Sequence, residues 1–308
     1  MGLLMTEDYH GLGLSDRDIA TLKKHGLSNL LHKIKEQQHT LELQKEALET
    51  ALTKIEKDLK AARDAQMSLL PKDLLGLPEV DFQARFYPSQ YVSGDIYNIF
   101  RLDECNFGVY HIDVSGHGVP AALFSVSLSQ MLNTNVSKRN ILKVPINKPP
   151  YYKINSPDKV IASLDEDRSF ERHGLYFTMI YMIVNTKEKK IQFTRAGHNY
   201  PIIIRADKNI EIFKAGSIPI GWDLPRNDEV VEVNINSGDR LFLYSDGIHE
   251  ATNPDRKMFT LKRLCNSLKD SSDLSLDESL DKLISELRQF IGQDNFEDDV
   301  SILGISLK

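Results

Sequence analysis

The sequence predicts an α+β domain preceded by a long coiled-coil helix, and three observations support this fold class. Aromatic residues divide the chain: after Tyr9 none occurs until Phe82, and only the second region can build a globular core. Between Leu27 and Leu70 there is neither Gly nor Pro, and good helix formers dominate. From residue 80 onward short β-rich runs recur, and helical patterns interrupt them without strict alternation, which favours α+β over a doubly wound parallel sheet.

The long helix carries an apolar heptad pattern. Alternating steps of four and three residues from Leu27 to Leu69 meet ten apolar residues among thirteen. The exceptions, Gln38, Lys45 and Gln66, all occupy a positions, where polar residues fix alignment and oligomer state. We therefore expect a parallel two-stranded coiled coil and a homodimer. The alternative is one amphipathic helix lying on its own domain.

Domain organisation follows from the same pattern. We expect an N-terminal segment at residues 1–26, a dimerisation and signalling helix at 27–70 and a globular domain at 71–308. Pro71 ends the predicted helix because proline cannot continue the backbone hydrogen bonding.

Strand predictions rest on short runs of β-branched and aromatic residues that are bounded by turn residues. These runs occupy residues 82–87, 96–102, 107–114, 176–184, 190–197, 201–205, 210–213, 229–235, 240–245 and 300–307. Helical patterns lie at residues 119–134, 157–165, 260–268 and 276–291. The Pro-rich, basic stretch 138–153 predicts a surface loop.

Charge and cysteine content exclude several classes of function. The 308 residues include 38 basic and 44 acidic ones, so the net charge of −6 gives no general attraction to nucleic acid or anionic membrane. Cys105 and Cys265 lie far apart without metal-ligand spacing, which suits a reducing compartment. No apolar run approaches the roughly 18 residues of a membrane span. We expect a cytoplasmic protein.

Four short motifs place Asp beside Gly or another Asp at the end of a β-like run. They are SGD (93–95), DVSGHG (113–118), SDG (245–247) and EDDVS (297–301). A carboxylate at a strand end is held rigidly, and an adjacent Gly permits close backbone approach. Converging carboxylates repel one another unless a cation lies between them, and such hard oxygen ligands suit Mg²⁺ or Mn²⁺. The motifs therefore indicate a two-metal site, although each one alone is typical of a turn.

In their order and context these motifs resemble the metal-dependent phosphatases of the protein phosphatase 2C superfamily, specifically the bacterial SpoIIE/RsbU-type branch. The resemblance covers residues 62–308 and implies a four-layer α-β-β-α sandwich. The matching blocks are ARDAQMSLLP (62–71), YVSGDIYN (91–98), DVSGHGVPAAL (113–123), YFTMIY (176–181), RAGHNYP (195–201), IPIGW (218–222), SGDRLFLYSDGIHEATN (237–253) and EDDVSIL (297–303).

The resemblance also implies the ligands of two Mn²⁺ or Mg²⁺ ions. These are the carboxylates of Asp95, Asp113, Asp246 and Asp298, the backbone carbonyl of Val114 and, as a further option, Asp299. Asp113 would bridge the ions, and the Val114 carbonyl and Asp95, directly or through water, would complete the ligands of the first ion. Asp246 and Asp298 would hold the second ion. Three residues depart from the family pattern without removing a carboxylate. Ser93 replaces the first Gly of Gly-Gly-Asp, and Val300 and Ser301 stand where Ile and Thr are common.

Carried to function, the resemblance implies a protein serine/threonine phosphatase of bacterial signalling. Its relatives act on STAS-type anti-sigma-factor antagonists and often carry a sensor or receiver domain ahead of the helix, and residues 1–26 are too short to be one. The family also implies that the junction helix, which ends with Leu69 and Leu70, acts as a switch. A non-catalytic dimeric signalling scaffold is the alternative from another class.

Two histidine motifs allow other interpretations. The spacing of His111, Asp113 and His117 is compatible with a zinc hydrolase. We expect His198 to be structural and to hydrogen-bond the backbone before Tyr200.

Overall fold

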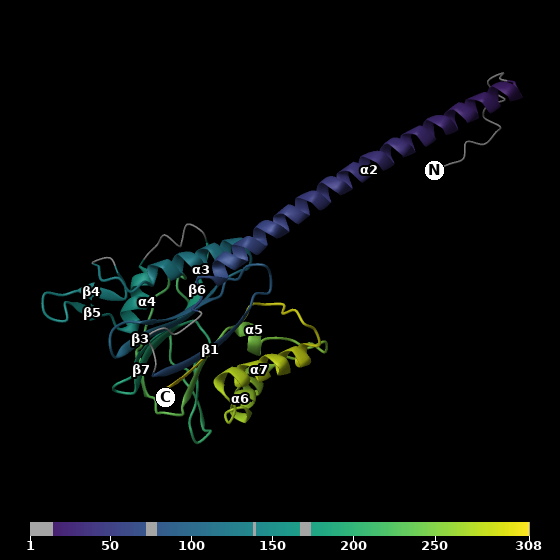
Figure 1. Cartoon of the computed structure of the whole chain (residues 1–308). Coiled ribbons are helices and arrows are strands. Elements are labelled where there is room, and N and C mark those ends of the chain that lie inside the picture. Colours follow the sequence, from purple (N-terminus) through teal and green to yellow (C-terminus); the bar gives the residue numbers. More distant parts are fainter. Residues whose placement is uncertain (1–14, 72–78, 138–139, 167–173, 308) are drawn as a thin grey trace. The chain divides into compact units, whose positions relative to one another are not determined.

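The computed structural model describes residues 15–71, 79–137, 140–166 and 174–307 (Figure 1). The chain divides into two compact units, Met1–Lys60 and Ala61–Lys308. No helix in the described ranges is long and apolar enough to cross a bilayer.

The long helix α2 spans Asp16–Met67 and therefore begins well before the predicted start at Leu27. Its first turn is closed by a reciprocal pair: the Asp18 amide donates to Ser15 Oγ at 3.3 Å, and the Ser15 amide donates to the Asp18 carboxylate at 3.2 Å. Gly26 lies inside the helix, where it costs only about 1 kcal/mol relative to Ala. The Ser-x-x-Asp sequence that begins at residue 15 therefore marks the start of the helix, which the prediction placed at Leu27.

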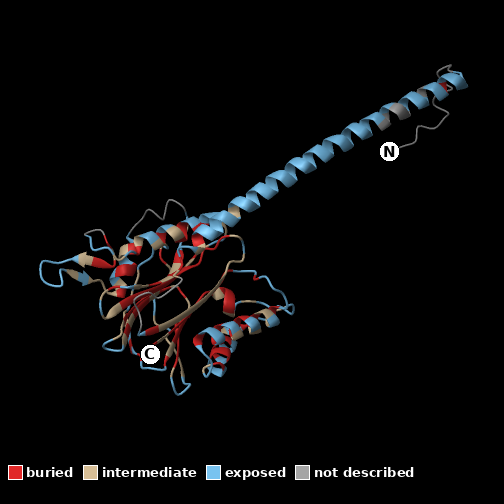
Figure 2. Cartoon of the chain, in the orientation of Figure 1, coloured by how far each residue is buried: buried red, intermediate tan, exposed pale blue. Residues whose placement is uncertain are grey.

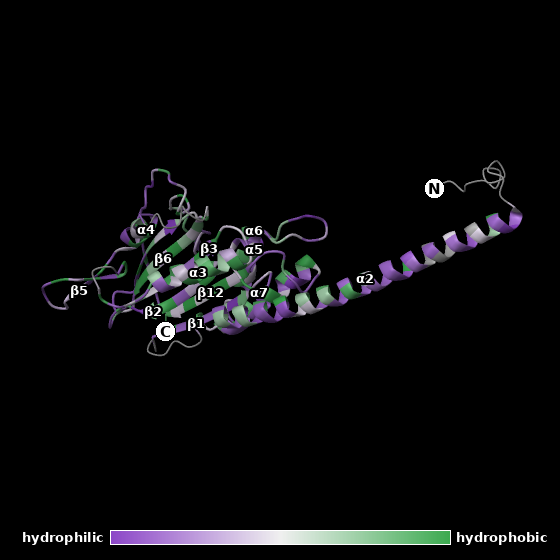
Figure 3. Cartoon of the chain, turned by 90° about the horizontal axis from the view of Figure 1, so that it is seen from above, coloured by the Kyte–Doolittle hydropathy of each residue, from purple (hydrophilic) through white to green (hydrophobic). Residues whose placement is uncertain are grey.

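The predicted coiled-coil seam is exposed to solvent on α2. Most of α2 is exposed (Figure 2). The exposed apolar residues of the seam are Ile34, Leu41, Leu48, Leu52 and Ile55, whereas the side chains of Leu27 and Leu31 lie outside the described residues. Figure 3 shows hydrophobic and hydrophilic residues alternating along α2. An exposed apolar stripe is what pairing of two helices requires, and the homodimer stays a prediction.

We expect the triple replacement of Leu48, Leu52 and Ile55 by Asp to convert a dimer into a monomer. Pairing would bury these side chains, and unpaired charges in that seam are costly. Light scattering should give twice the chain mass of 35.0 kDa for the wild type and a single mass for the variant.

A matched control places the same charges on other faces of the helix. Thr53, Lys54 and Lys57 occupy b, c and f positions of the heptad, so replacing them by Asp should leave the dimer intact. A monomeric wild type at micromolar concentration would contradict the coiled coil.

The second unit is built on two five-stranded antiparallel sheets. One contains β1 (Val80–Tyr87), β12 (Val300–Leu307), β11 (Arg240–Tyr244), β8 (Ile202–Ile204) and β9 (Ile210–Ile212), in that order. The other contains β10 (Val231–Asn234), β7 (Lys190–Ala196), β6 (Phe177–Asn185), β3 (Asn106–Val114) and β2 (Ile96–Arg101). All ten predicted strands are therefore confirmed.

Helices cover the outer faces of both sheets. The helices α3 (Val119–Met131) and α4 (Pro157–Asp165) contact β2, β3, β6 and β7. On the other sheet lie α5 (Asp246–His249), α6 (Thr260–Asp270) and α7 (Leu276–Ile291). The predicted α-β-β-α layering is confirmed, and buried residues follow the strands of both sheets in Figure 2. One apolar cluster fills the space between the sheets and under α3 and α4, and a second lies beneath α6 and α7.

Two features differ from the sequence prediction. The loop predicted at 138–153 contains a hairpin of β4 (Lys143–Pro145) and β5 (Tyr152–Ile154). The Asn140 side-chain oxygen accepts the amide of Lys143 at 2.8 Å, and the Lys143 ammonium lies 4.8 Å from the centre of the Tyr152 ring. These local contacts stabilise strands too short to show periodicity. Helix α5 was also missed, because four residues give no helical pattern.

Candidate functional site

The four acidic motifs meet at one edge of the sandwich because of strand pairing. In one sheet, β2 and β3 are antiparallel with Ile96 opposite Ile112, so Asp95, just before β2, lies beside Asp113 near the end of β3. The two sheets are joined there by Ser301 Oγ, which donates to Asp95 Oδ2 at 2.5 Å.

The same rule places the acidic residues of the other sheet. Strands β11 and β12 are antiparallel with Tyr244 opposite Ile302. Asp246 follows the end of β11 and Asp298 precedes the start of β12, so both lie at the same edge. The structure therefore brings together all four carboxylates that the sequence singled out.

The carboxylates are close enough to raise one another's pKa. Burial is the main cause for Asp95, and the charges of Asp113 and Asp299 add to it. Burial likewise raises the pKa of Asp113, and the charges of Asp246 and Asp298 raise it further. Each negative charge in this cluster disfavours the others. The site is therefore short of positive charge.

Asp298 and Asp299 have different surroundings. Asp299 Oδ1 accepts the amide and the hydroxyl of Ser89 at 2.7 and 2.9 Å. Its Oδ2 accepts the Ser93 hydroxyl at 2.6 Å and the Gly94 amide at 3.0 Å. Asp299 thus clamps the SGD loop with both carboxylate oxygens, whereas Asp298 lines the adjoining cavity. This arrangement favours Asp298 over Asp299 as a metal ligand.

Ser93 has a structural role in the SGD motif. Its hydroxyl donates to Asp299 and accepts the Asp95 amide at 3.0 Å. The next residue must be Gly, because a Cβ on Gly94 would lie 2.9 Å from the Val114 carbonyl oxygen. The loop that carries Asp95 is therefore packed tightly against the carbonyl that the resemblance assigns to the first metal.

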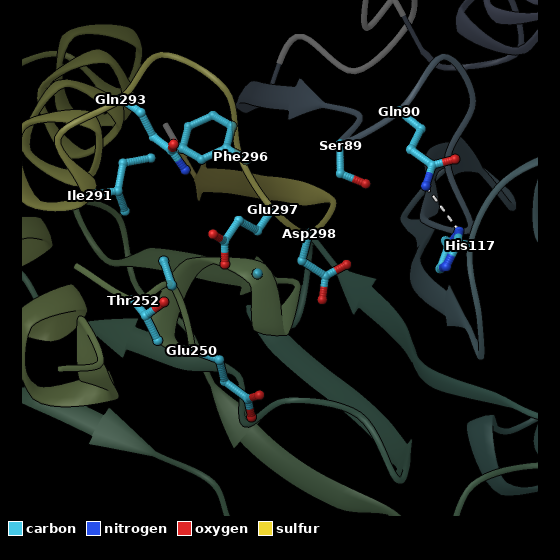
Figure 4. A pocket seen from close by; sticks show the side chains of 12 residues that line it. Ser89, Gln90, His117, Glu250, Thr252, Ile291, Gln293, Phe296, Glu297 and Asp298 are labelled. Carbon is cyan, nitrogen blue, oxygen red and sulfur yellow. Dashed lines mark hydrogen bonds between the residues drawn. The ribbon is translucent and has the colours of Figure 1, made fainter. Parts of the chain in front are cut away.

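A cavity of about 440 Å³ opens beside the carboxylates (Figure 4). Glu250, Glu297 and Asp298 contribute its carboxylates, and at its rim His117 Nδ1 lies 3.0 Å from Gln90 Nε2 (Figure 4). None of the described lining residues is Lys or Arg. An incoming anion would therefore meet negative charge unless cations were bound.

In the described part of the chain, no group of three or more His, Cys, Asp and Glu side chains is already arranged to hold one metal ion. The chemistry of the donor set nevertheless fits divalent cations. Buried carboxylates that raise one another's pKa, together with an adjacent backbone carbonyl, are hard oxygen donors whose repulsion a cation relieves. Mg²⁺ keeps several waters and needs few protein ligands, so a complete cage is not required.

The histidine interpretations are corrected by the structure. His111 is fully buried, and its ring nitrogens lie 2.8 Å from His198 and 2.8 Å from Ser301. No nitrogen of His111 is left for zinc, so the spacing with Asp113 and His117 does not form a zinc site. His198 is buried and structural, as expected, but its ring hydrogen-bonds the side chains of His111 and Thr178 instead of the backbone.

Gln66 is a site residue that the heptad pattern misassigned to the coiled-coil seam. It is buried within the second unit, where its Nε2 donates to the Ser93 carbonyl at 2.7 Å and its Oε1 accepts the Ser93 amide at 3.1 Å. Its Nε2 also donates to Ser125 Oγ at 3.3 Å. The last turn of α2 thereby holds the SGD loop. Of the two leucines at the junction, Leu70 is buried and Leu69 is exposed.

Comparison with known families tests the resemblance. The family described as Stage II sporulation protein E (SpoIIE) matches residues 103–308, which is more than half of the chain. The chain belongs to the SpoIIE family. The family predicted from the acidic motifs is thus confirmed, and the match includes Asp113, Asp246 and Asp298.

Curated relatives of this SpoIIE family member include two longer bacterial proteins. Phosphoserine phosphatase RsbP of Bacillus subtilis is 24% identical over 82% of this chain and 58% of the relative. Protein IcfG of Synechocystis is 25% identical over 80% of this chain and 41% of the relative. The chain therefore spans about half the length of these relatives.

Solved structures confirm the fold. The SiaA-PP2C domain of Pseudomonas aeruginosa superposes with a TM-score of 0.69 at 20% identity, covering 84% of this chain and 99% of that domain. The PP2C phosphatase domain of SpoIIE from Bacillus subtilis gives a TM-score of 0.58 at 22% identity, covering 74% of this chain and 63% of that one. The SpoIIE family member described here therefore has the protein phosphatase 2C fold.

Proposed function

We propose that the protein is a metal-dependent phosphatase of phosphoserine and phosphothreonine in proteins. The observation that carries the proposal is the convergence of Asp95, Asp113, Asp246 and Asp298 from two sheets at one edge. No described basic side chain lines the adjoining cavity to balance them. Membership of the SpoIIE family supports the same chemistry.

The chain's own residues would hold and orient two divalent cations, Mn²⁺ or Mg²⁺. Asp113 would bridge them. Asp95 and the Val114 carbonyl would complete the ligands of the first ion, and Asp246 and Asp298 would hold the second ion. When bound, such cations supply a nucleophilic water at neutral pH and neutralise the charge of the transferred phosphoryl group. Asp299 and Gln66 would hold the SGD loop so that Asp95 stays in place.

The proposed substrate is a serine-phosphorylated protein of the STAS type that opposes an anti-sigma factor. One relative is named a phosphoserine phosphatase, and a structural neighbour contains RsbU and RsbW domains of Rv1364c from Mycobacterium tuberculosis. A sensor or receiver domain acting on the N-terminal helix would supply the signal. The two free cysteines, Cys105 and Cys265, suit a cytoplasmic location.

We propose that the chain is organised in three segments. Residues 71–308 would form the catalytic domain and 27–70 the dimerisation and signalling helix, with residues 1–26 ahead of it. The observed helix extends the middle segment back to Asp16.

Hydrolysis of p-nitrophenyl phosphate tests the proposal against a non-catalytic scaffold. The purified chain should release p-nitrophenol in Mn²⁺, stop when EDTA is added and resume when Mn²⁺ is restored in excess. A scaffold would give background rates in all three conditions, and a zinc hydrolase would be restored by Zn²⁺ in preference to Mn²⁺. A phosphoserine peptide should give the same pattern.

A further inference from the structure

A continuous line of hydrogen-bonded side chains runs from the candidate metal site into the core. Ser301 Oγ donates to Asp95 Oδ2 at 2.5 Å, and His111 Nε2 lies 2.8 Å from Ser301 Oγ. The other nitrogen of His111, Nδ1, lies 2.8 Å from His198 Nε2. His198 Nδ1 lies 2.8 Å from Thr178 Oγ1. Four hydrogen bonds thus connect Asp95 to Thr178, which lies outside the acidic motifs.

This line links the two sheets of the sandwich. Ser301 belongs to β12 in one sheet, whereas His111 and Thr178 belong to β3 and β6 in the other. Ser301 and His111 are fully buried, and His198 is 4% exposed. The ring of Tyr97 stacks on His111 with an interplanar angle of 5°. Polar groups in such a core are tolerated only when they are hydrogen-bonded, and in this line both nitrogens of both histidine rings have a hydrogen-bond partner.

The chemistry of the groups gives the line one direction. Ser301 has a single hydroxyl proton, and it goes to the carboxylate of Asp95. His111 must then donate from Nε2 to Ser301, which makes its Nδ1 an acceptor. His198 must therefore donate from Nε2, and its Nδ1 accepts the Thr178 hydroxyl. Every proton in the line points toward Asp95.

Both histidines are neutral in this line, because each ring donates from one nitrogen and accepts at the other. The guanidinium of Arg195 donates to the His198 carbonyl at 2.7 Å and so fixes the backbone beside the ring.

We propose that Ser301, His111 and His198 are positioning residues, which fix Asp95 Oδ2 through this one-way line so that Oδ1 is offered to a cation. The inference rests on the proposed metal-dependent function. A carboxylate that is already oriented loses less freedom when it binds a metal, and residues behind metal ligands typically change metal affinity by about 10- to 100-fold when they are replaced.

The test compares two replacements of Ser301. Ser301→Ala removes the hydroxyl, whereas Ser301→Thr keeps it. Titration of Mn²⁺, followed by the electron paramagnetic resonance of the free ion, measures each dissociation constant. We expect Ser301→Ala to weaken one of two sites by about 10- to 100-fold and Ser301→Thr to bind as the wild type does.

A control removes a buried serine elsewhere. Ser279, on α7, is also fully buried, and its hydroxyl oxygen lies 2.6 Å from that of Ser271. Ser279→Ala should leave both Mn²⁺ constants unchanged, because it removes a core hydrogen bond away from Asp95. Equal losses in Ser279→Ala and Ser301→Ala would overturn the positioning role.

The histidine tautomers give a second test that needs no variant. In ¹⁵N-labelled wild type saturated with diamagnetic Mg²⁺, long-range ¹H–¹⁵N spectra should show both His111 and His198 protonated on Nε2 only. Protonation of either ring on Nδ1 would overturn the one-way line even if Ser301→Ala fails to fold. A wild type that binds no Mn²⁺ would instead overturn the proposed function, and the inference with it.

Discussion

Asp113→Asn is expected to abolish phosphate release while making the metal-free chain harder to unfold. Asp113 is the carboxylate whose pKa is raised by burial and by the charges of both Asp246 and Asp298. Because its pKa is raised above the unfolded value of 3.8, the folded state binds its proton more tightly. The ionised carboxylate therefore destabilises the metal-free fold at neutral pH, and Asn removes that charge.

Thermal unfolding in EDTA measures the gain. Each unit of pKa elevation is worth about 1.4 kcal/mol, and 1 kcal/mol shifts the unfolding temperature of a domain of this size by about 2 to 4 °C. The variant should unfold at the higher temperature at pH 7.5, and the difference should shrink as the pH falls toward the unfolded pKa of 3.8, because a raised folded pKa costs nothing once both states are protonated. Mn²⁺ should stabilise the wild type more than the variant. A variant that keeps wild-type activity in Mn²⁺ would refute the site.

Gln66→Ala is expected to lower kcat and to raise the Mn²⁺ concentration needed for half-maximal activity. Gln66 binds both backbone polar groups of Ser93, two residues before Asp95, so its loss frees the loop that carries a proposed ligand. Effects of the order of tenfold are typical when support behind a metal ligand is removed. A chain that begins at Pro71 lacks the same contact and should behave similarly, whereas removal of residues 1–26 should change little.

The two junction leucines provide the matched control. Leu70 is 6% exposed and packs in the core of the second unit, whereas Leu69 is 40% exposed. Leu70→Ala should reproduce part of the Gln66→Ala effect by loosening the end of the helix, and Leu69→Ala should not. If Gln66→Ala and the chain that begins at Pro71 keep wild-type rates and Mn²⁺ dependence, the helix serves only for dimerisation, and the switch must be abandoned.

The strands and the acidic cluster could be predicted because their signals are local. Runs such as FGVYHIDV (107–114) and VSILGISL (300–307) have the composition of buried strands, and the structure has strands there. Antiparallel pairing then brings the end of one strand to the start of its neighbour, so motifs at strand ends meet at one edge without further information.

Contacts between distant residues could not be predicted in this way. Gln66 occupies an a position of the heptad, as the polar residues Gln38 and Lys45 do, and only its bonds to Ser93 show that it contacts the globular domain. Nothing local distinguishes His198 from a turn residue, because its partners His111 and Thr178 lie on other strands. Such hydrogen bonds join residues that have no fixed spacing in the sequence, so periodicity and motif spacing carry no trace of them.

Calorimetric titration of Mn²⁺ into the metal-free wild type and into Asp113→Asn tests the central claim most directly. If the carboxylates of both sheets hold two cations bridged by Asp113, the wild type should bind two Mn²⁺ per chain. The variant should lose at least one of the two sites. Absence of Mn²⁺ binding by the wild type, or equal binding by the two proteins, would contradict the account.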